Sequence, residues 1–206
     1  MDAREEILAA LRRAPRVAAP APSLEGLGTP GGELAARFAD GVAAVGGAVV
    51  RAATREAAAA ALRDLPVRRA ARRVISAAAG LGDPTEPPPA ATDPHALEGV
   101  DLAVLVARLG VAENGACWID GGDLPHRALV AVPEHLVVAL DAAALVPDLH
   151  AAYARLDLAR HPRFGLFLAG PSKTADIEQA LVIGAHGHRS LTVLLVGPDA
   201  AAVAPG

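Results

Sequence analysis

One stretch of this sequence gathers residue types that bind small ligands. Gly170 to Glu178 follows an apolar run and holds two hydroxyls, one cation and two carboxylates. A turn after a strand, at the edge of an open α/β sheet, is a common ligand site, and its backbone N–H groups could hold an anion. The alternative is a turn whose Ser and Thr only cap a following helix. The candidate ligand-binding residues here are Gly170, Ser172, Lys173, Thr174 and Glu178.

The charged residues of this stretch differ in what they could do. Lys173 is the only lysine among 19 basic residues. A compact ammonium could contact an anion, although chance can also leave one lysine. On a helix, Asp176 and Glu178 would point about 200° apart, so at most one could face the ligand. We expect Asp176 to be that residue and name it a candidate catalytic group; a purely capping Asp is the alternative.

Farther on, His186 and Gly187 are two more candidate ligand-binding residues. An imidazole between glycines can approach a ligand closely and move protons near neutral pH. A structural turn is the competing interpretation. His188 completes a His-x-His pair, which on a strand would point to opposite faces, so we expect no metal site.

A third motif is the turn Glu113-Asn114-Gly115 between two apolar segments. Asn-Gly is typical of a tight turn, and Glu113 could then be a solvated neighbour of that turn. In the functional interpretation, the turn presents Glu113 in a cleft as a nucleophile or general base, with Asn114 and Gly115 as ligand contacts. We expect this turn and the Gly170 stretch to face one cleft at the carboxyl ends of the strands.

Several function classes lose support from motifs that the sequence lacks. We find no dinucleotide fingerprint, Walker loop, zinc-protease motif or nucleophile elbow. Cys117 is the only cysteine, so this chain forms no internal disulfide and cannot ligate an iron-sulfur cluster by itself. The net charge of -4, without a basic stripe, argues against nucleic acid and membrane surfaces. The apolar runs are too short to span a bilayer and no export signal is recognised, so we expect a cytoplasmic protein.

The elements that must position these motifs form an alternating pattern. Glu33 to Val45 and Thr54 to Leu65 are predicted helices, and a helix is also predicted from Ala142 to Leu156. Continuous apolar strands between helices predict a three-layer α/β fold, with a largely parallel sheet covered by helices on both faces. The predicted strands are residues 48–52, 74–77, 102–107, 116–120, 128–132, 136–140, 165–168 and 191–196.

The first 32 residues read as a separate unit. Residues 3–14 predict a short amphipathic helix, and the Pro- and Gly-rich residues that follow predict a flexible tether. The α/β domain is therefore expected over residues 33–206, with the first helix docking at a distance or on another subunit.

The stretch from Gly170 to Glu178, with Leu181 to Gly187 and Ala112 to Trp118, resembles the signature of the lactate utilization protein C family, which carries the LUD domain. The likeness is close over about residues 100–197. It implies a fold like that of the ribose-phosphate isomerase, glucosamine-phosphate deaminase and coenzyme A transferase superfamily. It also implies work beside iron-sulfur partner proteins in the oxidation of L-lactate to pyruvate.

Two functions follow as expectations, and a purely structural or regulatory role with a vestigial cleft is a third alternative. The first is a subunit or accessory protein of a lactate-oxidising system that has no redox cofactor of its own and binds a small anionic metabolite. The second is a stand-alone isomerase or acyl/CoA transferase that uses Glu113, since Glu113-Asn114-Gly115 is similar to the Ser-Glu-Asn-Gly motif of type I coenzyme A transferases. Ala112 replaces the serine of that motif.

Overall fold

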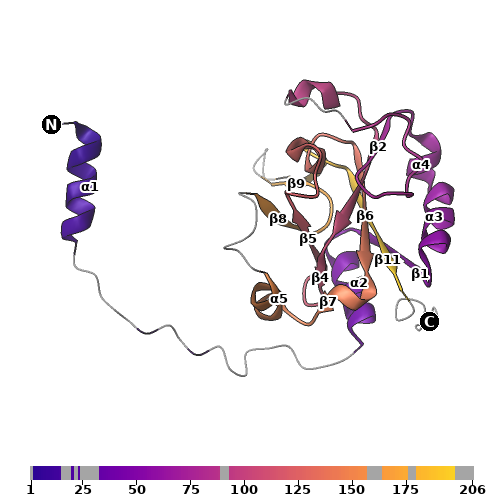
Figure 1. Ribbon diagram of the computed structural model, residues 1–206, viewed down its shortest axis with the longest axis horizontal. Helices are drawn as coiled ribbons and strands as arrows, with labels where there is room; N and C mark the ends of the chain where they lie inside the picture. The colour runs from indigo at the N-terminus through magenta and orange to yellow at the C-terminus, as the bar shows by residue number, and fades with distance from the viewer. Residues whose placement is uncertain are drawn as a thin grey trace.

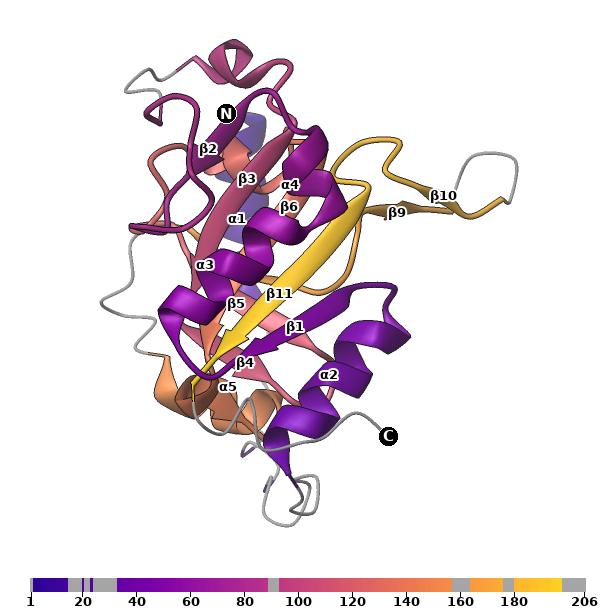
Figure 2. The ribbon, with the colours of Figure 1, turned by 90° about the vertical axis from the view of Figure 1, so that its right-hand side faces the viewer.

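A parallel sheet of five strands runs through the protein, in the order β1-β11-β6-β3-β2 (Figure 2). The computed structural model describes residues 2–14, 20, 23, 33–88, 93–156, 164–175 and 180–197. Every neighbouring pair in this sheet is parallel, as its continuous apolar strands predict. The strands are β1 (Ala48–Ala52), β2 (Val74–Ser76), β3 (Leu102–Ala107), β6 (His135–Asp141) and β11 (Ser190–Val196).

One face of this sheet is covered by α3 (Arg55–Asp64) and α4 (Pro66–Ala70). The Thr54 side chain caps α3 by accepting a hydrogen bond from the N–H of Ala57 at 3.2 Å. Leu62 of α3 is fully buried and packs in one cluster with alternate strand residues such as Val104 and Leu194. Their neighbours along the strands point to the other face, so a hydrophobic core lies on each face of the sheet.

The other face carries α2 (Leu34–Ala44) and a second sheet. Phe38 of α2 is buried with Val193 of the parallel sheet and Ile119 of the second sheet. The predicted three-layer α/β fold is therefore confirmed, but the sequence did not predict that the third layer contains strands as well as a helix. The second sheet has the order β7 (Leu145–Val146), β4 (Leu109–Val111), β5 (Ala116–Asp120) and β8 (Gly165–Leu168).

Two predicted elements are wrong. Residues 128–132 do not form a strand, because the His126 side chain accepts from the N–H of Ala128 and begins the 3-10 helix η2 (Arg127–Val130). The predicted helix over residues 142–156 is three elements, η3 (Ala142–Ala144), β7 and α5 (Leu149–Arg155). Pro147 separates the last two, as expected of a residue that disfavours helix before it.

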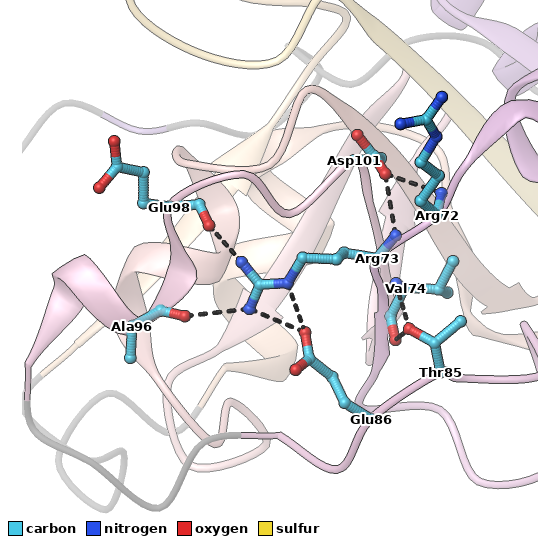
Figure 3. A network of polar contacts seen from close by, with 8 residues as sticks. All are labelled: Arg72, Arg73, Val74, Thr85, Glu86, Ala96, Glu98 and Asp101. Atoms are coloured by element: carbon cyan, nitrogen blue, oxygen red, sulfur yellow. Dashed lines mark hydrogen bonds and ion pairs between the residues drawn. The ribbon is translucent and has the colours of Figure 1, made fainter.

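Arg73, just before β2, joins the loops that follow that strand (Figure 3). Its guanidinium donates to the Glu86 carboxylate at 2.9 Å, to the Ala96 carbonyl at 3.2 Å and to the Glu98 carbonyl. The Asp101 carboxylate accepts from the backbone N–H of Arg73 at 2.8 Å, and this bond lowers the pKa of Asp101. One side chain thus holds β2 to η1 (Pro94–Leu97), the short helix that leads into β3.

The helix α1 (Ala3–Arg13) stands apart from the α/β layers (Figure 1). Asp2 caps it, none of its residues is buried, and Ile7 and Leu11 are 61% and 64% exposed. The domain boundary at residue 32 stays a prediction, because most of residues 15–32 lie outside the described ranges. In the part of the chain that is described, no helix is both long and apolar enough to cross a membrane.

Candidate functional site

The Gly170 turn lies at the amino ends of the parallel strands, whereas the sequence predicted the carboxyl ends. It follows β8 of the second sheet, and the N–H of Ser172 donates to the His188 carbonyl at 3.0 Å. The next residue, Arg189, donates its N–H to Glu134, just before β6, at 2.7 Å. These contacts place the turn beside the amino ends of β6 and β11. The expected position at the carboxyl ends is wrong, because β8 is antiparallel to β5 and is not part of the parallel sheet.

Four predicted ligand residues nevertheless surround one cavity of about 280 Å³. They are Gly170, Ser172, His186 and Gly187. Lys173 and Thr174 lie instead on β9 (Lys173–Thr174), which pairs with β10 (Val182–Ile183), and the Lys173 side chain is exposed. Asp176 and Glu178 fall outside the described residues. The roles assigned to all these residues stay predictions.

His188 is the buried titratable group of this cavity, and sequence reasoning set it aside as half of an improbable metal pair. Its side chain is 4% exposed, and Nε2 lies 3.0 Å from the Gly170 carbonyl oxygen. Burial lowers the pKa of His188 from its usual 6.5, against the carbonyls of Gly170 and Val130, which favour the charged ring. A neutral ring that donates from Nε2 to Gly170 fits these surroundings.

We expect His188 to make the protein less stable in acid. The unfolded chain binds a proton at about pH 6.5 and the folded chain only at lower pH, so the free energy of unfolding falls as the pH drops below 6.5. His188→Gln keeps a donor for the Gly170 carbonyl and should flatten this part of the stability profile. Urea unfolding between pH 5 and 8 measures it. The matched control is His95→Gln at an exposed position; an equal change in both variants would contradict the assignment.

The Glu113-Asn114-Gly115 turn is built by its own hydrogen bonds. Asn114 Oδ1 accepts from the N–H of Ala116 at 3.0 Å, and Gly115 has a φ of 69°, in the region that favours glycine. Glu113 is exposed, and its carboxylate accepts from the N–H of Leu149, the first residue of α5, at 3.2 Å. This geometry accounts for all three residues structurally, and the catalytic role of Glu113 stays a prediction.

Both motifs pack on the end of α2 through their glycines. A Cβ on Gly115 would lie 2.3 Å from Val42 N, and a Cβ on Gly170 would lie 2.4 Å from the Val45 carbonyl oxygen. The two turns therefore sit on neighbouring parts of one helix. Glu113, however, is not among the residues that line the 280 Å³ cavity. The described contacts direct its carboxylate to α5 instead, so they give no support to a cleft shared by the two motifs.

A different cavity, of about 310 Å³, opens at the carboxyl ends of β3, β6 and β11, where open α/β sheets usually bind ligands. Its charged lining residues are Arg55, the first residue of α3, and Asp141, the last residue of β6. The Arg55 guanidinium donates to the Ala79 carbonyl and forms no ion pair with another described residue. Sequence reasoning missed both residues, although Asp141 ends a strand and Arg55 begins the helix that follows one, and that was the available signal.

A larger cavity of about 470 Å³ adjoins the carboxyl end of β2, where Ser76 and Asp123 line it. Arg108 donates to both carboxylate oxygens of Asp123, at 2.5 and 2.7 Å, and lowers the pKa of Asp123. This carboxylate is thus already paired. Over the described ranges, no three or more His, Cys, Asp or Glu side chains gather so as to hold a metal ion.

Comparisons with known proteins find relatives of the second half of the chain. The LUD domain family matches residues 94–196. An uncharacterized protein of Neisseria meningitidis is 31% identical over 102 residues, which are 48% of this chain and 44% of that protein. Lactate utilization protein C of Halalkalibacterium halodurans is 30% identical over 95 residues, 44% of this chain and 41% of the relative. The chain thus matches less than half the length of these two relatives.

The fold has a counterpart among solved structures. A DUF162 family protein from Deinococcus radiodurans has a TM-score of 0.58 and 21% sequence identity, over 82% of this chain and all of the other. At this identity, the likeness concerns the arrangement of helices and strands.

Proposed function

Because this chain belongs to the LUD domain family, we propose that it serves bacterial L-lactate utilization as a component without a redox cofactor of its own. The relatives named lactate utilization protein C support the pathway. In this proposal the chain works in the cytoplasm beside iron-sulfur proteins that carry the electrons from lactate. Its own part is to bind a small anionic metabolite.

The division between this chain and its proposed partners is supported by its cysteine content. An iron-sulfur cluster needs several thiolates. Cys117 is the only cysteine of the chain, it is fully buried in the core, and burial raises its pKa to about 12. Such a thiol does not fit the binding of a cluster, which we therefore assign to the partner proteins.

The observation that carries the anion-binding part is the position of Arg55. Arg55 lines the 310 Å³ cavity at the carboxyl ends of three parallel strands. A guanidinium presents five N–H donors in a planar fork that matches a carboxylate. Arg55 already gives one hydrogen bond to Ala79, which leaves further donors for a ligand. The exposed Glu113 lacks the desolvation that a nucleophilic carboxylate needs, so nothing favours the transferase alternative.

Deletion of the gene tests this proposal. We expect the deletion strain to lose growth on L-lactate as sole carbon source, because lactate is not oxidised. Growth on pyruvate should be normal, because pyruvate is the product of that oxidation. The growth rates on the two carbon sources, with the intact gene restored as control, measure the effect. Normal growth of the deletion strain on lactate would overturn the proposed function.

A further inference from the structure

We propose that the 310 Å³ cavity binds a 2-hydroxy acid in preference to the corresponding 2-oxo acid, with the carboxylate on Arg55 and the hydroxyl on Asp141. This inference rests on the proposed function, since it gives the small anion a chemical class. Both residues line this cavity, at the start of α3 and at the end of β6. The cavity thus offers one cationic and one anionic group to the same ligand.

Arg55 supplies the contact that either acid can make. Thr54 fixes the first turn of α3 through its hydrogen bond to Ala57, and the guanidinium is held by the Ala79 carbonyl. A side chain tethered at both ends is oriented before the ligand arrives, which lowers the entropy lost on binding. Because 2-hydroxy and 2-oxo acids both carry a carboxylate, Arg55 does not discriminate between them.

Asp141 supplies the discrimination. Its Oδ1 accepts from the N–H of Ala143 at 2.9 Å, and this bond fixes the carboxylate at the start of η3. A carboxylate accepts hydrogen bonds and has no proton to donate. A 2-hydroxyl can donate to it, whereas a 2-oxo oxygen is itself an acceptor and would place two acceptors together. Asp141 therefore favours the reduced member of such a pair.

The remaining wall suits a small alkyl group. Val106, Leu140 and Val196 lie at the ends of the three strands and line the same cavity. Gly197 has a φ of 134°, and a Cβ there would lie 3.6 Å from Asp141 Oδ1. The absence of a side chain at this position leaves the carboxylate accessible. A short 2-hydroxy acid fits this cavity. Its methyl group would contact the apolar residues, its carboxylate would contact Arg55, and its hydroxyl would contact Asp141.

Calorimetric titration of the full chain with L-lactate and with pyruvate tests this inference. We expect lactate to bind at least about fivefold more tightly, as a hydrogen bond to a charged group contributes more than this factor requires. Asp141→Asn keeps an oxygen that can cap Ala143 but adds an N–H₂ donor for the 2-oxo group. The preference should therefore disappear or reverse. Arg55→Lys should weaken both ligands and leave their ratio unchanged. The matched control for the charge is Asp64→Asn, outside the cavity.

Equal binding of lactate and pyruvate by the wild-type chain would overturn the inference, as would an unchanged ratio in Asp141→Asn. A wild-type chain that binds neither lactate nor pyruvate would also overturn it. The growth of the deletion strain on lactate is a separate measurement from the titration. The proposed ligand and the proposed function can therefore be contradicted independently. Melting temperatures of the variants show whether each remains folded.

Discussion

Gly115→Ala should destabilise the protein by about 2–5 kcal/mol, the sum of a left-handed backbone cost for Ala and an overpacked contact. The φ of Gly115 is 69°, and a Cβ there would lie 2.3 Å from Val42 N and 2.6 Å from the Gly41 carbonyl carbon. Both are backbone atoms of α2, which cannot turn aside as a flexible side chain could. Thermal unfolding followed by circular dichroism should show a midpoint lower by roughly 10 °C.

Gly80→Ala separates the two costs. Gly80 has a φ of 71°, but a Cβ there would meet no atom within 4 Å. This variant carries the backbone cost alone, about 1–2 kcal/mol. A midpoint for Gly115→Ala that equals that of Gly80→Ala would contradict the close packing of the turn on α2.

The parallel sheet could be predicted from the sequence because its strands are continuous apolar runs. Residues 102–107 and 136–140 are apolar throughout, and such runs occur where both faces of a strand are covered. The run at 128–132 has the same composition, but residues 128–130 belong to a 3-10 helix, because His126 caps that helix through a contact that composition does not reveal. In the second sheet, β5 and β8 were predicted as strands, but their place in a separate sheet and the two shorter strands were not. Strands as short as Leu145–Val146 carry too few residues for any periodicity.

The sites were harder to predict than the strands. Residues near one another in sequence, such as Ser172 and His186, do surround one cavity. Whether they lie at the amino or the carboxyl ends of the parallel strands depends on which strand pairs with β8. The sequence pattern does not specify that pairing. Arg55 and Asp141 are 86 positions apart and come together only because β1 and β6 flank β11. Neither residue belongs to a recognisable motif, so pattern alone could not pair them.

Arg55→Met should strongly weaken anion binding while the protein stays folded. Loss of a charge-assisted contact costs about 1.5–3 kcal/mol, which is roughly a 10- to 100-fold weaker affinity for lactate. The guanidinium is exposed, and its bond to the Ala79 carbonyl is the only described hydrogen bond that the substitution removes. We therefore expect a melting temperature within a few degrees of the wild type. Arg69→Met is the matched control, since Arg69 is an exposed arginine of α4 paired with Asp64 and lies outside the cavity.

Complementation of the deletion strain with the wild-type, Arg55→Met and Arg69→Met chains tests the central claim most directly. Growth on L-lactate and on pyruvate is measured at equal levels of the three proteins. The account predicts that Arg69→Met restores growth on L-lactate as the wild-type chain does, whereas Arg55→Met does not, and that all three strains grow normally on pyruvate. Full growth on lactate with a folded, normally expressed Arg55→Met chain would contradict it.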